Sequence, residues 1–519
     1  MVTSNIAESI DISSLYYSDL LAILCHYIYN LQPTEKKSLH KFASVKFSDF
    51  VELAMNQFPD LRSPFKEKRV NPDQFSCIPD LILSQSQEDK ALLLGVIGSI
   101  DTMLDIGISE SPPLFLQAKK CPQIDDLYGE RSNSWYKCNA LNKITNKQYG
   151  TLLPKLHCAW SKKTNRTIQS VGLDPLSFAL LNFYWIPSGY SWDVTHLFCD
   201  FYGCGFNSKN IDPNLKILST PLDFQAPFLA VEDSDGQTFN IQYVTENDAR
   251  LKARMKKIIS QAVQREADIV LFPEMMGTPE SIQYCKNCVS KNIDDLFAHS
   301  RPKLILLPTR EYQAKGKWIN ELDILDEEGK IIFRYHKQHP YYFDMKTVGE
   351  NGKMVKRLYE PIGTDGDGKL CVIHIPGIGR IGVVICADIF APGYLEHLVK
   401  HLKITLLLWP VFSFGIDSMQ RALGPALTYS CDVVLCNTCA AWDETFEPLE
   451  NRPKNIGFNK EFINVYYPYG HKEKNIAKGC TVNTNCSSDS CSGCVFLTEV
   501  PNTYDGVPTA PTQFRLEEN

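Results

Sequence analysis

The sequence lacks the features that mark membrane-spanning and secreted proteins. No run of about 20 consecutive apolar residues offers a membrane span, although 44% of the 519 residues are hydrophobic. The first residues, MVTSNIAESIDISSLYYSDL, have neither the basic start nor the apolar core of a secretory signal. We therefore expect a soluble, cytoplasmic protein whose 18 cysteines stay reduced.

The sequence also lacks a concentrated basic surface of the kind that binds nucleic acid. Its formal net charge is −7, and its lysines and arginines are scattered along the chain. The densest basic stretch, RLKARMKKIISQAVQRE over 250–266, carries its apolar residues at helical spacing. That spacing favours a solvated helix face, so we assign this stretch no nucleic-acid partner.

The length of the chain favours two domains, because 519 residues exceed what one ordinary core organises. We expect residues 1–210 to form a mainly helical domain of unknown role. Three apolar, helically patterned segments support this, at 14–31, 47–58 and 87–107. This half shows no internal repeat and no catalytic motif.

Residues 215–519 are predicted to form a second domain, because the pattern changes to short β-rich runs separated by helices. Segments 248–265 and 416–430 are the predicted helices of this α/β domain. The turn sequence DEEGK at 326–330 joins two strands as a hairpin, so the sheet should be mixed. The predicted strands are 239–244, 268–274, 303–309, 320–326, 330–337, 379–388, 404–412 and 431–438.

Three of these strands are predicted to end on a chemically reactive group. Glu274 ends DIVLFPE, Lys337 ends KIIFRYHK, and Cys386 lies near the end of GRIGVVICAD. The carboxyl ends of strands face the ligand crevice of an α/β sheet, so these groups should meet there. A thiol is mostly protonated at neutral pH, and a carboxylate base or a nearby cation makes it nucleophilic. Lys337 and the amide of Ala387 would stabilise the developing negative charge.

At these residues the sequence resembles the nitrilase superfamily, the carbon-nitrogen hydrolases with a Glu-Lys-Cys triad. The matching segments are LFPE at 271–274, YHKQHP at 335–340 and GRIGVVICAD at 379–388. LYEPIGTDGDG at 358–368 is similar to the family segment that carries a second, assisting glutamate, here Glu360. The resemblance covers roughly residues 235–445.

The resemblance implies a nitrilase-like four-layer αββα sandwich, preceded here by the helical domain and usually assembled into homo-oligomers. It implies that Cys386 attacks a small-molecule amide or nitrile while Glu274 accepts the thiol proton. Lys337 would stabilise the tetrahedral intermediate and Glu360 would help to hold the geometry. A thioester-type acyl-enzyme then forms, and the chemistry needs no metal and no organic cofactor.

The Cys-rich tail, CTVNTNCSSDSCSGC, raises the possibility of a structural zinc site. Its cysteines are Cys480, Cys486, Cys491 and Cys494. Only the last two have the two-residue interval that is typical of paired zinc ligands, so reduced surface thiols are the default interpretation.

The thiol of Cys386 and the domain around it also admit interpretations without hydrolase chemistry. Cys386 could be a small buried apolar residue, which is the commoner fate of cysteine. His336 and His339 flank Lys337, but no Cys-His protease signature surrounds Cys386. The domain could also be a catalytically idle or regulatory assembly module. Residues 150–182 bear a weaker resemblance to bacterial defence proteins that carry nitrilase-like domains.

Overall fold

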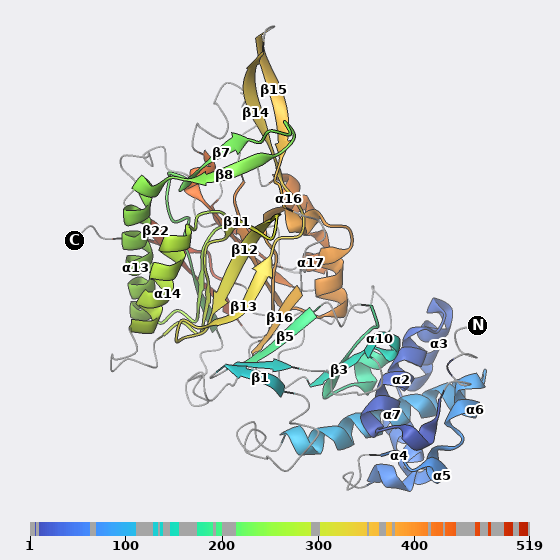
Figure 1. Ribbon diagram of the computed structural model, residues 1–519. Helices are drawn as coiled ribbons and strands as arrows, with labels where there is room; N and C mark the ends of the chain where they lie inside the picture. The colour runs from blue at the N-terminus through green and yellow to red at the C-terminus, as the bar shows by residue number, and fades with distance from the viewer. Residues whose placement is uncertain are drawn as a thin grey trace. The chain divides into compact units, whose positions relative to one another are not determined.

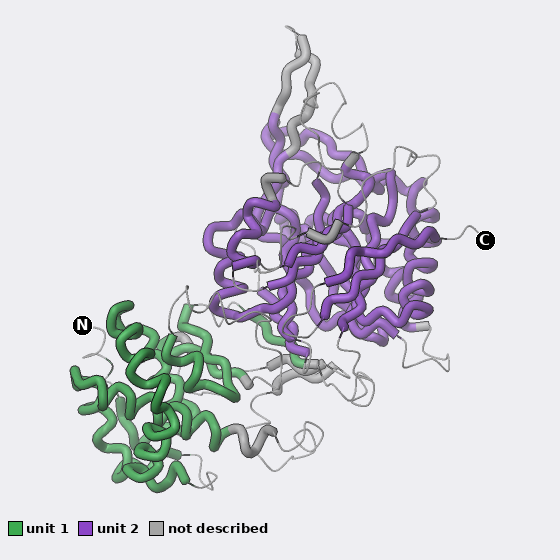
Figure 2. Tube along the Cα trace, turned by 180° about the vertical axis from the view of Figure 1, so that it is seen from behind, with its two compact units in different colours: residues 1–131, 136–158, 164–200 green, residues 132–135, 159–163, 201–519 purple. Residues whose placement is uncertain are grey.

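We describe the protein from a computed structural model. Residue 6 and the segments 10–62, 69–109, 128–132, 135–138, 146–154, 174–189, 194–199, 214–291, 301–349, 352–362, 370–375, 379–413, 417–428, 431–442, 462–467, 476–478, 493–501 and 508–516 are described. The chain divides into two compact units, shown in Figure 2: residues 1–131, 136–158 and 164–200 form the first, and residues 132–135, 159–163 and 201–519 form the second.

Helices dominate the first unit, as the apolar periodicity predicted. The longest helix, α7 (Gln87–Ser109), packs against α2, α3, α4 and α6. Its Gly95 is required by close approach, because a Cβ there would lie 2.2 Å from the backbone oxygen of Phe50. The other described elements of the first 200 residues are α2 (Tyr17–Tyr29), α3 (Pro33–Ala43), α4 (Phe47–Gln57), α5 (Pro72–Phe75), α6 (Ile78–Leu83), α10 (Asn146–Tyr149), α12 (Leu176–Ala179), β1 (Tyr128–Ser132), β2 (Trp135–Cys138), β3 (Thr151–Pro154), β4 (Phe183–Ile186) and β5 (Val194–Cys199).

The second unit contains two mixed β-sheets. In the first sheet, β6 (Asn214–Ser219), β9 (Ile269–Leu271) and β10 (Leu304–Leu306) are parallel, and β11 (Arg310–Ala314), β12 (Lys317–Leu325), β13 (Ile331–His336), β22 (Cys494–Pro501) and β23 (Thr512–Arg515) add antiparallel pairs. In the second, β17 (Gly379–Val383), β18 (Leu406–Val411) and β19 (Asp432–Asn437) are parallel, flanked by antiparallel β16 (Leu370–Ile375), β20 (Ile463–Tyr466) and β21 (Ile476–Lys478).

Helices cover both outer sides of this pair of sheets, as Figure 1 shows. Helices α13 (Asp248–Gln264) and α14 (Pro279–Lys291) lie on one side, with α16 (Asp417–Ala422) and α17 (Gly424–Thr428) on the other. The sheets contact each other directly, since the Cys436 thiol on β19 donates to the carbonyl oxygens of Thr220 and Leu271. The predicted α/β fold with its αββα layers and its helical N-terminal region is therefore confirmed.

The hairpin predicted at residues 326–330 is present and joins β12 to β13. Asp326 accepts the backbone N–H groups of Glu328 and Lys330 at 3.0 and 2.8 Å, and Gly329 has a φ of 79° that favours glycine. The predicted helix at 416–430 is instead two short helices, α16 and α17, because Pro425 in the first turn of α17 has no N–H to continue the helix from α16.

Two of the three strands that carry the reactive groups end earlier than the sequence predicted. Strand β9 ends at Leu271 and β17 ends at Val383, so Glu274 and Cys386 each lie three residues beyond the strand. Lys337 directly follows β13, as expected. The reactive groups therefore lie in the turns that follow the strands and not in the strands themselves.

The second unit also contains two further β-hairpins. Strands β7 (Phe228–Glu232) and β8 (Phe239–Tyr243) form one, and β14 (Tyr342–Gly349) and β15 (Gly352–Tyr359) form the other, visible at the top of Figure 1. The N–H of Tyr359 donates to the carbonyl of Gln237, which joins them. The β14–β15 hairpin begins after Tyr341 and ends before Glu360, so it delivers both residues to one place.

The Cys-rich tail lies mostly outside the described residues. Of the four zinc candidates only Cys494 is described, half-buried at the start of β22. Where the structure is described, no cluster of three or more metal-ligating side chains occurs. Likewise, no described helix is long and apolar enough to cross a bilayer.

Candidate active site

Cys386 stands at a strained point of the backbone. It opens a one-turn 3-10 helix, Cys386–Phe390, and its φ of 41° is unfavourable for a residue with a Cβ atom. The indole Nε1–H of Trp409 on β18 donates to the Cys386 carbonyl at 3.1 Å and helps to hold this conformation. The thiol is fully buried, which fixes its position.

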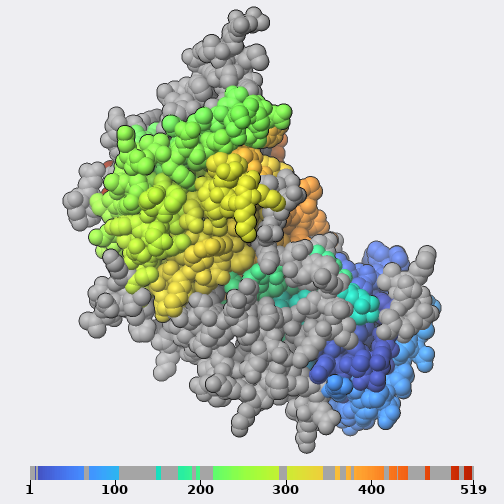
Figure 3. Space-filling model, viewed as in Figure 1, coloured from blue at the N-terminus to red at the C-terminus, as the bar shows by residue number. Residues whose placement is uncertain are grey.

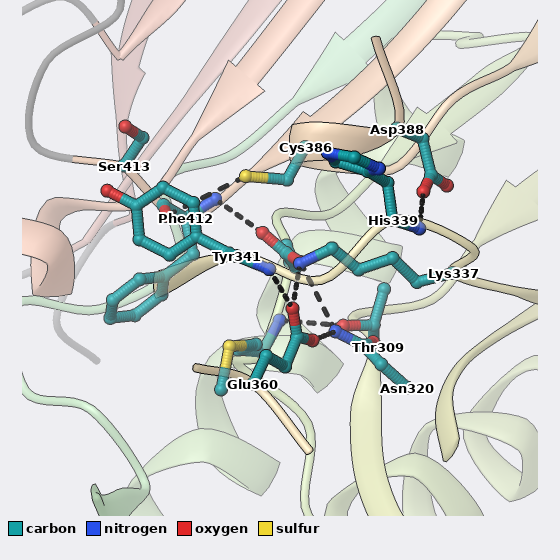
Figure 4. A network of polar contacts seen from close by, with 12 residues as sticks. Thr309, Asn320, Lys337, His339, Tyr341, Glu360, Cys386, Asp388, Phe412 and Ser413 are labelled. Atoms are coloured by element: carbon teal, nitrogen blue, oxygen red, sulfur yellow. Dashed lines mark hydrogen bonds and ion pairs between the residues drawn. The ribbon is translucent and has the colours of Figure 1, made fainter. Parts of the chain in front are cut away.

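Lys337 joins two buried carboxylates. Its ammonium nitrogen lies 2.7 Å from Glu274 Oε1 and 2.6 Å from Glu360 Oε2, and all three side chains are nearly inaccessible to solvent (Figure 4). The three residues come from three different segments, after β9, β13 and β15. The structure therefore brings together the lysine and both glutamates singled out in the sequence.

Neutral donors contact all four oxygens of these two carboxylates. The side-chain amide of Asn320 on β12 donates to Glu274 Oε1 at 3.2 Å and to Glu360 Oε1 at 2.9 Å. The N–H of Phe412 donates to Glu274 Oε2, and the N–H of Tyr341 donates to Glu360 Oε2, both at 2.9 Å. Each carboxylate is thus fixed by a charged and a neutral partner.

Burial and charge move the two carboxyl pKa values in opposite directions. Burial, with a smaller contribution from Glu360, raises the pKa of Glu274 although Lys337 opposes it. Burial opposes the shift at Glu360, where Lys337 and hydrogen bonds lower the pKa below its usual range. Burial alone would lower the pKa of Lys337, but the two carboxylates raise it well above normal. The raised pKa suits Glu274 to accept a proton, whereas the lowered pKa of Glu360 suits it to remain an ionised partner of Lys337.

The thiol of Cys386 faces Glu274. It lies 3.9 Å from the carbonyl oxygen of Phe412, whose N–H donates to Glu274, and the charge of Glu274 acts on it. Burial, followed by the charge of Glu274, raises the pKa of the thiol well above its usual value, and Lys337 opposes this only in part. The resting group is therefore a thiol next to a carboxylate, and not a preformed thiolate paired with Lys337.

Asp388 connects the turn that carries Cys386 to the turn that follows Lys337. Its Oδ1 accepts the backbone N–H groups of Gln338 at 2.9 Å and His339 at 2.6 Å. Burial raises the pKa of Asp388 to about 7, although Lys337 and these N–H groups oppose the shift. Asp388 does not contact the thiol in any of these interactions; it holds the two turns in register.

The site also contains residues that sequence reasoning did not select. Asn320 and Phe412 make direct contacts with the carboxylates, and neither was a candidate. Asn320 could have been noticed as a polar residue inside the predicted strand NELDILD. The role of Phe412 rests on its backbone N–H, for which the side chain gives no signal.

Residues 238–401 match the family model described as carbon-nitrogen hydrolase. This segment contains Glu274, Lys337, Glu360 and Cys386. The predicted nitrilase-superfamily domain is therefore confirmed over these residues.

Solved structures similar to this chain include Nit3 of Saccharomyces cerevisiae, a member of branch 10 of the nitrilase superfamily. It is 14% identical with a TM-score of 0.33, and the match covers 56% of this chain and 90% of that chain. An amidase from Nesterenkonia sp. is 13% identical with a TM-score of 0.33, covering 56% and 91% respectively.

Proposed function

We propose that the carbon-nitrogen hydrolase domain of residues 238–401 cleaves a non-peptide carbon–nitrogen bond in a small-molecule amide or nitrile. The observation that carries the proposal is that the buried Cys386 thiol and the Glu274 carboxyl both contact the backbone of Phe412, while Lys337 and Asn320 hold the other oxygen of Glu274. A nucleophile, a base and a fixed cation are the components of acyl transfer through cysteine.

The first half-reaction forms a thioester in the case of an amide. Glu274 takes the proton of the thiol as sulfur bonds to the carbonyl carbon, and the π electrons move onto oxygen. Lys337 and the N–H of Ala387 stabilise that negative charge. When the intermediate collapses, the carbon–nitrogen bond breaks and Glu274 gives its proton to the leaving amine, which departs.

Water completes the reaction. Glu274 accepts a proton from a water molecule that attacks the thioester carbon, and collapse of the second intermediate expels the Cys386 sulfur. The sulfur regains a proton and the acid is released. Because both halves need Glu274 to accept and return a proton, a carboxyl with a raised pKa suits the role better than an ordinary one.

Glu360 takes a different role because its pKa is lowered. A carboxylate that stays ionised keeps the ammonium of Lys337 charged and in place throughout the cycle. We therefore assign Glu360 to positioning Lys337, and Lys337 to stabilising the tetrahedral intermediate.

The test uses a panel of aliphatic and aromatic amides and nitriles with the wild type and a Cys386→Ala variant. We expect release of ammonia or amine by the wild type, and a covalent adduct in its intact mass with slow substrates. Cys386→Ala should lose both. Cys371→Ala is the matched control, because Cys371 is also a fully buried cysteine of this unit and should retain turnover.

The competing interpretation is a regulatory assembly module whose triad is idle. That interpretation would be supported if the panel gave neither turnover nor adduct and the Cys386→Ala variant kept normal biological activity. The same result would contradict the hydrolase proposal. The homo-oligomer implied by the family resemblance stays a prediction, which sedimentation of the full chain would check.

A further inference from the structure

A third glutamate lies beside the network and takes no part in the reaction proposed above. Glu311 on β11 has only 2% of its surface exposed. Its backbone is held by Tyr243 on β8, whose hydroxyl donates to the Glu311 carbonyl at 2.8 Å and accepts its N–H at 3.0 Å. Neither carboxyl oxygen receives a hydrogen bond from a donor among the described residues.

The strand register places this carboxyl on the inner face of the sheet. Glu311 pairs directly with Asn320 across the antiparallel strands β11 and β12. Directly paired residues point to the same face, about 5 Å apart at Cβ. Because Asn320 contacts Glu274 and Glu360, Glu311 points at the same cluster. The neighbouring Arg310 points to the opposite face, where it pairs with Glu321.

The carboxyl of Glu311 lies near that of Glu360. Asn320, the cross-strand partner of Glu311, donates to Glu360, and the two carboxyls act on each other's pKa. Two ionised carboxylates offer only acceptors, so a hydrogen bond between them needs a proton on one of them. Burial and the charge of Glu360 raise the pKa of Glu311 well above normal, whereas the pKa of Glu360 is lowered.

The charges around Glu311 lead to the same assignment. The groups that face it are the carboxyls of Glu360 and Glu274, the ammonium of Lys337, and the hydroxyl of Tyr243 at its backbone. One ammonium thus faces three buried carboxyls. An ionised Glu311 would be a second uncompensated negative charge in a dry site, whereas a neutral one adds a donor.

We propose that Glu311 is a neutral carboxylic acid that donates its hydrogen bond to Glu360 and so acts as a positioning residue for the Lys337–Glu360 pair. The positioning role rests on the function proposed above, but the protonation of Glu311 does not. The proton lets the Glu311 carboxyl donate a hydrogen bond, which an ionised carboxylate at this position could not do. No bond to substrate is formed or broken at Glu311.

The protonation is tested by infrared spectroscopy on the full chain in heavy water at neutral pH. The spectrum of the wild type minus that of Glu311→Gln should contain the carbonyl stretch of a protonated carboxylic acid. Carboxylate stretching bands in its place would overturn the proposal. This measurement needs no substrate. An inactive wild type would therefore contradict the proposed hydrolase activity, and the infrared band would still decide whether Glu311 is protonated.

The positioning role is tested by comparing Glu311→Gln with Glu311→Leu. Gln keeps a neutral donor and should retain kcat within about threefold, whereas Leu removes the donor and should lower kcat at least about tenfold with little change in KM. Equal losses in both variants, or full activity in Glu311→Leu, would overturn the role. If Glu311→Leu does not fold, retention of kcat by the Gln variant supports the role and a tenfold loss there contradicts it.

Discussion

Strands β11 and β12 carry charged side chains on both faces. The two faces differ in the number of cations that lie near their carboxylates. On the outer face, Glu321 pairs with Arg310 at 2.7 Å and His336 at 3.1 Å, and Tyr312 donates to it at 2.8 Å. Burial opposes the change, but these partners lower the pKa of Glu321 to about 2.

The next carboxylate on the outer face, that of Asp323, also has several cationic partners. Asp323 lies 2.5 Å from Lys286, 3.5 Å from Arg310 and 3.4 Å from Arg334. The Arg334 side chain is 56% exposed, and residues of β12 and β13 reach the surface as the yellow area in Figure 3. Arg310, Lys286 and Arg334 thus outnumber the two carboxylates on this face.

The inner face shows the opposite balance. Among the described residues, three carboxyls, Glu274, Glu311 and Glu360, are near one ammonium, that of Lys337. A shortage of cations in a buried place raises the pKa of a carboxyl, so protons can be held and moved there. One pair of strands thus carries a network rich in cations on one face and, on the proposed function, borders a site of proton transfer on the other.

The largest effect should follow removal of the single inner cation. Lys337→Met leaves buried carboxylates without a cation, and we expect it to abolish turnover and lower the free energy of unfolding by about 3–5 kcal/mol. The loss should shrink at lower pH, because the abandoned carboxyls then have raised pKa values and protonate. Urea denaturation at two pH values measures this.

The matched control removes one cation of several from the outer face. Arg310→Met leaves Glu321 with His336 and Tyr312, so the cost should be about 1–2 kcal/mol and turnover should persist. Equal losses of stability in the two variants would contradict the contrast between the faces.

A smaller effect is expected at Asp388, whose pKa of about 7 lies well above the 3.8 of an ordinary aspartate. Between these values the folded protein holds a proton that the unfolded chain has released. The stability from Asp388 is therefore present at low pH and is lost as pH rises through 7. From pH 5 to pH 8 the wild type should lose about 2 kcal/mol more stability than Asp388→Asn. Parallel profiles in chemical denaturation would show that Asp388 is ionised throughout.

Much of the site was predictable because its reactive groups follow apolar strands. Glu274, Lys337 and Cys386 were found in this way, and a strand that ends in a reactive residue is a local signal in the sequence. The resemblance added Glu360, which follows β15 and has no distinctive pattern of its own. The α/β class was likewise accessible from the alternation of strands and helices, whereas the αββα layers came from the family resemblance.

The rest depends on register and on backbone atoms. Glu311 and Asn320 become neighbours only when β11 and β12 pair in one register, and β11 was not among the predicted strands. The N–H of Phe412 acts without its side chain, and the pKa order of Glu274 and Glu360 depends on burial and on contacts between distant segments. These are properties of the folded chain that no short stretch encodes.

The most direct test of the central claim, that Glu274 activates Cys386 by accepting its proton, is the rate at which Cys386 is alkylated. Iodoacetamide is a small electrophile that carries an amide, and peptide mass spectrometry reports the modification of Cys386 beside that of buried Cys371 in the same sample. Cys386 should react at least about a hundredfold faster than Cys371, and Glu274→Gln should lower its rate to that of Cys371. Equal rates in the wild type, or an unchanged Cys386 rate in Glu274→Gln, would contradict that claim.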